Sequence, residues 1–340
     1  MKKTTFCFST ATTNCYFNTR FSELKKITDP AKTVLITDQR VYKAHSKIFK
    51  GWNTIVIKAG EDYKVQATVD ALLDQLIKMG VDRHYTLVGV GGGVVTDLTG
   101  YTASIYMRGL RCGFVPTSVL AMVDASLGGK NGVDVGVYKN LAGTIKQPAF
   151  ILFDISLLST LPLKEWRNGF AEIIKHASLF DKRLFTQLSK RSLQFYQTNK
   201  TSLAQLIKKN AVLKLQLVTR DEFENGERRL LNFGHTLGHA LEKQYELSHG
   251  EAISIGMTAA AQLSEKLCGF TQKDKLVSVL SQYGLPTYAA YDTKKVFRVL
   301  SMDKKKAGEA VHYILLKELG SPVQQQIPFV KLEKLLTSLS

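Results

Sequence analysis

Two histidines lie four residues apart in a stretch that also carries two glycines. Apolar residues recur at helical spacing through this stretch and predict a helix over 230–245. Residues three and four apart share one face of a helix, so its polar residues would form a single stripe: Asn232, His235, His239 and Glu242. The two histidines could together hold one Zn²⁺, or place one metal ligand beside one base. Such a stripe is unusual for a solvated face.

Further candidate ligands lie outside this predicted helix. His249 immediately precedes the next apolar helix, and Glu172 lies among apolar neighbours, so its carboxylate is expected to be partly buried and to need a partner. One glutamate and two histidines leave a fourth position open for water or substrate, as in catalytic zinc sites. The spacing leaves two alternatives open. Glu242 could be the ligand in place of Glu172, and His176, four residues after Glu172, could simply pair with it.

Three consecutive glycines, Gly91, Gly92 and Gly93, follow a predicted strand and open a predicted helix. Consecutive glycines let the backbone approach a diphosphate, and a helix N-terminus offers N–H groups and a positive dipole to an anion. The stretch is not the G-x-G-x-x-G fingerprint, and no acidic residue stands about 20 positions later, where that motif would have one. The glycines therefore indicate either nucleotide binding or a tight turn between strand and helix.

Cations and small polar residues gather around other glycines. Asp124 and Lys130 flank a Gly-Gly pair, and Lys175 lies one helical turn from Glu172. Taken alone, each of these side chains fits a solvated surface. Their joint position beside an apparent metal site favours an anionic substrate, because lysine and arginine bind phosphate and carboxylate groups. The members of this group are Arg108, Asp124, Lys130, Lys139, Asn140, Lys175 and Arg228.

The elements that must position these residues differ between the two halves of the chain. Strands predicted at 33–37, 54–58 and 85–90, with a helix over 65–79, indicate an α/β domain with a mainly parallel sheet. From about residue 157 the periodicity is mostly helical. The elements predicted there are helices over 163–180, 200–220, 230–245, 250–268 and 273–283, and a late strand over 311–316. We therefore expect a domain boundary after residue 156.

The composition is that of an ordinary soluble globular protein, with 340 residues, 44% of them hydrophobic and 22% charged. No stretch is apolar enough for a membrane span, and polar residues near the N-terminus argue against an export signal. The net charge of +17 would attract anions, but no zinc-finger, homeodomain or RNA-binding signature accompanies it. Four cysteines without a C-x-x-C pair predict reduced thiols and a cytoplasmic location.

Together, these segments resemble the 3-dehydroquinate synthase family, which belongs to the sugar phosphate cyclases. The resemblance runs from Asp38 to about Gly320, with the motifs in the family's order. The stretches that carry it are 91–98, 123–130, 139–141, 168–175, 231–239 and 249–252. It implies a Rossmann-like NAD-binding α/β domain over 1–156 and a mostly α-helical zinc- and substrate-binding domain over 157–340.

The resemblance also implies roles for individual residues. It implies that Glu172, His235 and His249 bind Zn²⁺, for which Co²⁺ could substitute. Contacts to NAD are implied for Asp38, Glu61, Lys64, Gly92, Gly93, Asp97, Thr117, Ser118, Lys139, Thr160 and Leu161. Contacts to substrate are implied for Arg108, Asp124, Lys130, Asn140, Lys175, Lys214, Arg228, Asn232 and His239, and for one lysine in 303–305. The expected catalytic residues are Lys130, Lys175, Arg228, Asn232 and His239. Arg108 is expected to reach the neighbouring subunit's site in a homodimer.

The implied enzyme is a carbon–oxygen lyase of the shikimate pathway, which leads to the aromatic amino acids. It would convert 3-deoxy-D-arabino-heptulosonate 7-phosphate to 3-dehydroquinate and phosphate by transient NAD oxidation, phosphate elimination, re-reduction and intramolecular aldol closure. Its partner would be this small phosphorylated sugar acid, with neither nucleic acid nor membrane involved. This chain departs from the family's usual residues at Arg40, near the adenosine ribose, and at Asn131. The alternatives are another sugar phosphate cyclase, a polyol or glycerol phosphate dehydrogenase, and a basic nucleic-acid-binding protein.

Overall fold

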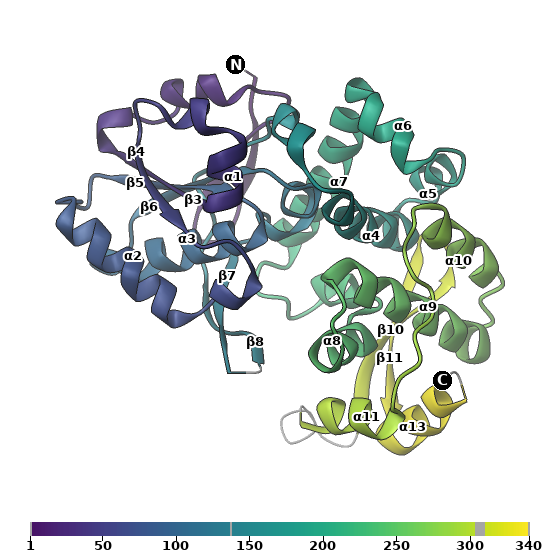
Figure 1. Cartoon of the computed structure of the whole chain (residues 1–340). Helices are drawn as coiled ribbons and strands as arrows, with labels where there is room; N and C mark the ends of the chain where they lie inside the picture. The colour runs from purple at the N-terminus through teal and green to yellow at the C-terminus, as the bar shows by residue number, and fades with distance from the viewer. Residues whose placement is uncertain (1, 137, 303–309, 339–340) are drawn as a thin grey trace. The chain divides into compact units, whose positions relative to one another are not determined.

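A computed structural model describes residues 2–136, 138–302 and 310–338 of the chain (Figure 1). The chain forms two compact units. Unit 1 comprises residues 1–166 and 200–224, and unit 2 comprises 167–199 and 225–340. The boundary predicted after residue 156 differs from this division in one respect above all. The helix over 200–220 packs with unit 1, although its helical periodicity resembles that of its neighbours in the sequence.

Unit 1 contains a seven-stranded sheet with the strand order β1-β2-β9-β6-β5-β3-β4. Strands β1 and β2 are antiparallel, and every other neighbouring pair is parallel. The strands are β1 (Thr4–Cys7), β2 (Thr12–Tyr16), β3 (Thr33–Asp38), β4 (Asn53–Ile57), β5 (Thr86–Gly91), β6 (Arg111–Pro116) and β9 (Phe150–Leu152). Along β3, Val34 and Ile36 pack into one core and Leu35 into another. Both faces of the sheet are therefore covered, which explains why its central strands are apolar without alternation.

The helices of unit 1 are α1 (Gln39–Ala44), α2 (Gln66–Lys78), α3 (Gly93–Ile105) and α7 (Lys200–Arg220). Short helical turns lie between them: η1 (Phe21–Lys26), η2 (Pro30–Lys32), η3 (Ser46–Phe49), η4 (Glu61–Tyr63), η5 (Tyr106–Arg108), η6 (Ala121–Ala125) and η7 (Ile155–Thr160). Strands β7 (Lys130–Val135) and β8 (Tyr138–Ile145) form a separate antiparallel ribbon. This ribbon packs on α3 through β7. It carries two predicted substrate residues, Lys130 on β7 and Asn140 on β8.

Unit 2 is mostly helical. Its elements are α4 (Leu163–Phe180, which begins in unit 1), α5 (Lys182–Leu188), α6 (Leu193–Thr198), η8 (Glu227–Asn232), α8 (His235–Gln244), α9 (His249–Cys268), α10 (Lys273–Gln282), α11 (Thr293–Met302) and α13 (Phe329–Thr337), with the hairpin of β10 (Ala310–Glu318) and β11 (Ser321–Pro328). Helix α9 is buried over most of its length and packs against α8, α10 and β10. Within the described ranges, no helix has both the length and the apolar character to cross a bilayer.

The predicted fold class, an α/β domain followed by a mostly helical one, is confirmed. Strands β3, β4 and β5 and helix α2 form within a residue or two of the predicted bounds. The single helix predicted over 230–245 is wrong, because the chain breaks at Gly234, whose φ is +81°. A Cβ there would lie 2.8 Å from the backbone nitrogen of Met257, so close packing on α9 requires glycine. Asn232 therefore lies on η8, and not on the helix that carries His235.

Candidate active site

Three side chains of metal-binding type converge in unit 2. The ligand atoms of Glu172, His235 and His249 all lie within 4.8 Å of one another. Oε1 of Glu172 is 3.1 Å from Nε2 of His249 and 3.7 Å from Nε2 of His235. One carboxylate oxygen and two imidazole nitrogens thus face a common point, and zinc commonly accepts this donor set.

The positions of these three residues follow from their helices. Glu172 lies in the middle of α4 between fully buried apolar residues, and is itself 0% exposed. His235 is the first residue of α8, placed there by the break at Gly234. His249 is the first residue of α9, which opens with a capping box in which Ser248 and Glu251 hydrogen-bond to each other. Helix starts therefore fix both imidazole rings next to a buried carboxylate.

The electrostatics of this cluster favour metal-binding protonation states for two of the three groups. Burial alone would raise the pKa of Glu172, but Lys175 and the two imidazoles hold that pKa well below its usual range. Burial, and then the charge of Lys175, lower the pKa of His235 well below its usual value. Burial opposes the charged form of His249, but its hydrogen bonds to Glu172 and Glu242 raise its pKa to about 9. A metal ion here would compete with a proton only at His249.

The alternatives that spacing left open differ in geometry. Oε2 of Glu242 lies 3.7 Å from Nδ1 of His249, the nitrogen that does not face Glu172 in this pairing. A carboxylate on that nitrogen is a common way to orient a metal-binding histidine. His176 lies 3.9 Å from Oε2 of Glu172, whereas Oε1 faces the other two histidines. His239, Glu242 and His249 also bring their ligand atoms within 4.8 Å of one another, but His239 is exposed and Glu172 is fully buried.

The other predicted site residues of unit 2 lie on the same elements or directly before them. Lys175 is 1% exposed and forms an ion pair with Oε2 of Glu172. His239 lies one turn after His235, with the two ring centroids 5.0 Å apart. Arg228, which is buried, and Asn232 both lie on η8. Residues 303–305, where one lysine was expected to contact substrate, lie outside the described residues.

In unit 1, the glycine turn lies at a reversal of the strand order. The chain passes from β3 to β4 on one side and then returns to β5 on the other side of β3. Ligands of open α/β sheets bind outside the carboxyl ends of the strands at such a point. The glycine turn follows β5, and Asp38 ends β3. The turn therefore lies where a nucleotide is expected.

The three glycines have different reasons to be glycine. A Cβ on Gly91 would lie 2.5 Å from the side chain of Val95, so packing alone excludes a side chain there. Gly92 has a φ of −76°, which any residue adopts, and its Cβ would make only an ordinary contact of 3.6 Å with Oγ of Ser118. A Cβ on Gly93 would lie 3.2 Å from Cβ of Ala125. Packing does not require glycine at position 92, whereas the approach of an anionic ligand to the start of α3 would favour it.

A buried lysine links the glycine turn to the β7–β8 ribbon. Lys64 is 4% exposed, and its ammonium group contacts both the Asp97 carboxylate on α3 and Oδ1 of Asn140 on β8. Burial opposes the charged form of Lys64, but Asp97 and Glu61 raise its pKa. Burial also raises the pKa of Asp97 to about 6, although Lys64 acts in the opposite direction. Lys64, Asp97 and Asn140, all predicted site residues, are thus in direct contact.

Several of the remaining predicted NAD contacts follow the carboxyl ends of parallel strands. Thr117 and Ser118 follow β6, and the backbone N–H of Thr117 donates to the carbonyl of Gly91 (2.9 Å). Glu61 follows β4, and Lys139 lies on β8. Thr160, at the end of η7, is hydrogen-bonded to the ring of His45 (2.9 Å), and Leu161 follows it. Asp38 accepts hydrogen bonds from the backbone N–H groups of Arg40 and Val41 and so also caps α1.

The predicted substrate residues of unit 1 include two ion pairs. Lys214 on α7 donates to the Asp124 carboxylate on η6 (2.6 Å), which explains why α7 packs with unit 1. Lys130 contacts the carboxylate of Glu224, which has a φ of +60°. The sequence offers no signal for Glu224, since no motif distinguishes it from the nearby acidic residues Asp221 and Glu222. Arg108 is exposed, and the described residues offer it no hydrogen bond or ion pair.

Comparison with known proteins identifies relatives over most of the chain. Residues 54–168 match the family model described as 3-dehydroquinate synthase N-terminal, and residues 169–306 match its C-terminal counterpart. A 3-dehydroquinate synthase of Campylobacter curvus is 36% identical over 91% of this chain and 92% of its own length. One of Pyrococcus abyssi is 40% identical over 81% of both. The structure of a 2-epi-5-epi-valiolone synthase from Streptomyces hygroscopicus, with NAD⁺ and Zn²⁺ bound, aligns over 100% of this chain and 98% of its own, with a TM-score of 0.87 and 25% identity.

Proposed function

Because this chain belongs to the 3-dehydroquinate synthase family, we propose that it converts 3-deoxy-D-arabino-heptulosonate 7-phosphate into 3-dehydroquinate and inorganic phosphate. The observation that carries the proposal is the convergence of Glu172, His235 and His249 on one point. This cluster stands in the same chain as a glycine turn at the reversal point of a parallel sheet. Those two features are what a reaction that needs both a nicotinamide cofactor and a divalent metal requires.

The residues fit both groups. Glu172, His235 and His249 would hold Zn²⁺ or Co²⁺, because one carboxylate and two imidazoles suit either ion. Gly92, Gly93 and the first N–H groups of α3 would hold the diphosphate of NAD, since an added side chain would fill the space at this helix start. When bound, NAD⁺ supplies a reversible hydride acceptor, and the metal supplies a positive charge that makes substrate hydroxyls more acidic.

The chain's own side chains bind and orient an anionic substrate. Lys130, His239, Arg108 and one of Asn140 or Asn232 are assigned to the phosphate group, because cationic and amide donors make strong hydrogen bonds to its oxygens. Lys175 keeps Glu172 ionised and also presents an ammonium group beside the metal ligands. Arg228 and the Asp124–Lys214 pair are assigned to the rest of the substrate. Holding one flexible molecule through several steps is the main catalytic contribution of these residues.

The nearest alternative is another sugar phosphate cyclase, because a valiolone synthase shares the fold at 25% identity. The test measures phosphate release from the heptulosonate 7-phosphate, glucose 6-phosphate and sedoheptulose 7-phosphate, with NAD⁺ and Zn²⁺ present. We expect release from the first substrate only, without accumulation of NADH. Release from one of the other two instead would identify a different cyclase. Stoichiometric NADH would identify a dehydrogenase.

We also propose a homodimer in the cytoplasm, in which Arg108 serves the second copy's site. The exposed position of Arg108, in left-handed backbone at φ +65°, supports a role outside its own subunit. The four cysteines, all present as free thiols, fit a reducing compartment. Sedimentation should give twice the mass of one chain. Mixing Arg108→Ala with Lys175→Ala protein should then restore turnover that neither variant has alone, and a monomer would contradict this part of the proposal.

A further inference from the structure

The register of the β7–β8 ribbon shifts between Val133 and Val135. Across this shift, Asp134 alone faces residues 139–141 of the partner strand. Extra residues on one strand of an antiparallel pair form a β-bulge, which redirects side chains and is often found beside active sites. This bulge contains Asn140, one of the residues assigned to the substrate. The conformation of the bulge therefore decides where the amide of Asn140 lies.

Asn140 has left-handed backbone at this bulge, with φ +53°. Asparagine adopts this conformation more readily than most residues, but such a conformation persists only where neighbouring groups stabilise it. The stabilising group is the carboxylate of Asp134, whose Oδ1 accepts a hydrogen bond from the backbone N–H of Asn140 (2.7 Å). A carboxylate is a stronger acceptor for a backbone N–H than a neutral group is. Asp134 thus stabilises the backbone conformation from which the amide projects.

Lys64 contacts both members of this pair. Its carbonyl accepts a hydrogen bond from the backbone N–H of Asp134 (2.7 Å), and its ammonium group contacts Oδ1 of Asn140. An ammonium group can only donate, so this contact occupies the acceptor side of the amide. The Nδ2 group of Asn140 remains, and none of the described residues accepts a hydrogen bond from it. The amide therefore offers a donor, which is the kind of group that a phosphate oxygen binds.

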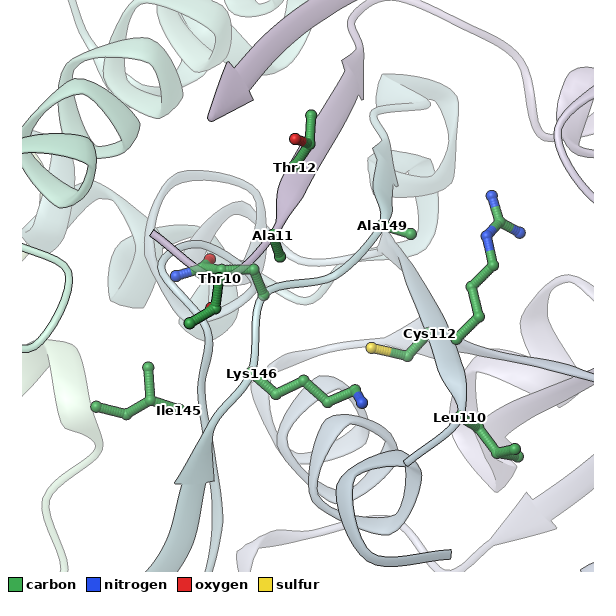
Figure 2. Close-up of a pocket in the computed structure, with 10 residues that line it drawn as sticks. Thr10, Ala11, Thr12, Leu110, Cys112, Ile145, Lys146 and Ala149 are labelled. Carbon is green, nitrogen blue, oxygen red and sulfur yellow. The ribbon is translucent and has the colours of Figure 1, made fainter. Parts of the chain in front are cut away.

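The opposite end of the ribbon is held by contacts that do not involve Asp134. Ile145, the last residue of β8, lines a cavity of about 350 Å³ together with Cys112 of β6 (Figure 2). The backbone N–H of the next residue, Lys146, donates to the carbonyl of Gly129 (2.8 Å), which directly precedes β7. Removal of the Asp134 carboxylate should therefore change the bulge without detaching the ribbon.

We propose that Asp134 is a positioning residue, which holds the bulge so that the Nδ2 group of Asn140 donates to the phosphate group of the substrate. Asp134 acts through this amide and not through contact with the substrate. The inference rests on the proposed function, which assigns either Asn140 or Asn232 to the phosphate group, and it selects Asn140. Asp134→Ala removes the acceptor, whereas Asp134→Asn keeps an oxygen that can accept the same backbone N–H.

The kinetic test measures phosphate release from the heptulosonate 7-phosphate, with NAD⁺ and Zn²⁺ present. Asp134→Ala should reduce kcat/KM at least about tenfold, and Asp134→Asn should stay within about threefold of the unsubstituted protein. Asp74→Ala, the same change at an exposed position of α2, should have no effect. Unchanged activity in Asp134→Ala, or equal losses in the two Asp134 variants, would overturn the proposal.

A double-mutant cycle separates positioning from a general structural role. If Asp134 acts through the amide of Asn140, Asp134→Ala should reduce kcat/KM by less than about twofold once Asn140→Ala has removed that amide. Thermal unfolding of each variant confirms that it is folded. A loss of about tenfold in both backgrounds would show that Asp134 acts through some other group, and would overturn the proposal.

Inorganic phosphate provides a readout that needs no turnover. In calorimetric titration of the protein loaded with Zn²⁺ and NAD⁺, its Kd should rise at least about fivefold in Asp134→Ala and in Asn140→Ala, but not in Asp74→Ala. This pattern without turnover of the heptulosonate would support the inference and reject the proposed substrate. An unchanged Kd in Asp134→Ala, or no phosphate binding by the unsubstituted protein, would overturn the inference.

Discussion

The glycine turn of unit 1 would present backbone to the proposed nucleotide, whereas the Glu172 cluster of unit 2 would present side chains to the proposed metal. In unit 1 the strand order places the turn, and the charged residues beside it neutralise one another, as Lys64 and Asp97 do. In unit 2, three segments of the chain bring one carboxylate and two imidazoles to a common point. The first arrangement depends on space and N–H groups, and the second depends on the charge and identity of single side chains. Substitutions in the two regions should therefore have different effects.

The largest effect is expected for Glu172→Gln, which keeps the shape of the side chain but removes its charge. Bound metal should fall to background, and turnover should fall at least about a thousandfold, or about 4 kcal/mol. The measurements are elemental analysis and phosphate release. Glu165→Gln, the same change in the first turn of α4, is the matched control and should alter neither. Retention of metal by Glu172→Gln would contradict its role as a ligand.

Lys64→Met should reduce the free energy of unfolding by about 3 kcal/mol, because it leaves the Asp97 carboxylate, whose side chain is only 15% exposed, without its cation. Urea denaturation measures the loss. In an Asp97→Asn background the same substitution should cost much less, since no charge is left unpaired. An equal cost in both backgrounds would show that packing, and not the ion pair, explains the effect. Lys78→Met, at the exposed end of α2, should be nearly neutral.

Glu242→Gln should weaken zinc binding by about 10- to 100-fold, because Glu242 orients His249 through the ring's other nitrogen. Competition with a chelator measures this affinity. The comparison with Glu172→Gln decides between the two glutamates that the sequence left as alternatives. Complete loss of metal in Glu242→Gln, with metal retained in Glu172→Gln, would make Glu242 the ligand.

The smallest effects on stability are expected for alanine substitutions of two neighbouring glycines, Gly91 and Gly92. Gly91→Ala should cost about 1–3 kcal/mol, because its Cβ would collide with Val95. Gly92→Ala should change stability by less than about 0.5 kcal/mol, since its Cβ meets no close protein atom. The same substitution should still weaken NAD binding, because the added methyl group would occupy space at the start of α3. Chemical denaturation and fluorescence titration with NADH measure the two quantities. Unchanged NADH affinity in Gly92→Ala would place the cofactor elsewhere.

The difference between the glycine turn and the side-chain cluster also explains which features could be predicted from the sequence. Central strands such as β3 and β5 are recognisable in the sequence because burial on both faces makes them continuously apolar. The glycine turn is recognisable because it comes directly at the end of β5. The break at Gly234 was not predictable, because the apolar spacing of Leu230, Phe233 and Leu237 continues across it while packing on α9 imposes the left-handed backbone. Periodicity likewise does not indicate that α7 packs with unit 1, which depends on contacts such as Lys214 with Asp124.

The predicted metal ligands also show where sequence-based prediction ends, here at the level of single atoms. Spacing identifies Glu172, His176, Glu242 and the histidines as candidates, but only the fold shows which oxygen or nitrogen each one presents. Oε1 of Glu172 faces two imidazoles, while its Oε2 faces Lys175 and, at 3.9 Å, His176. Such pairings depend on where α8 and α9 begin. Those starting points are set by tertiary packing and capping more than by helix propensity.

Anomalous diffraction at the zinc edge, from crystals of the zinc-loaded protein, tests the metal site most directly. One peak is expected per chain, within coordination distance of Oε1 of Glu172 and one nitrogen each of His235 and His249. A peak bound by His239 and Glu242 without Glu172, or no ordered peak in a fully active crystal, would contradict the account.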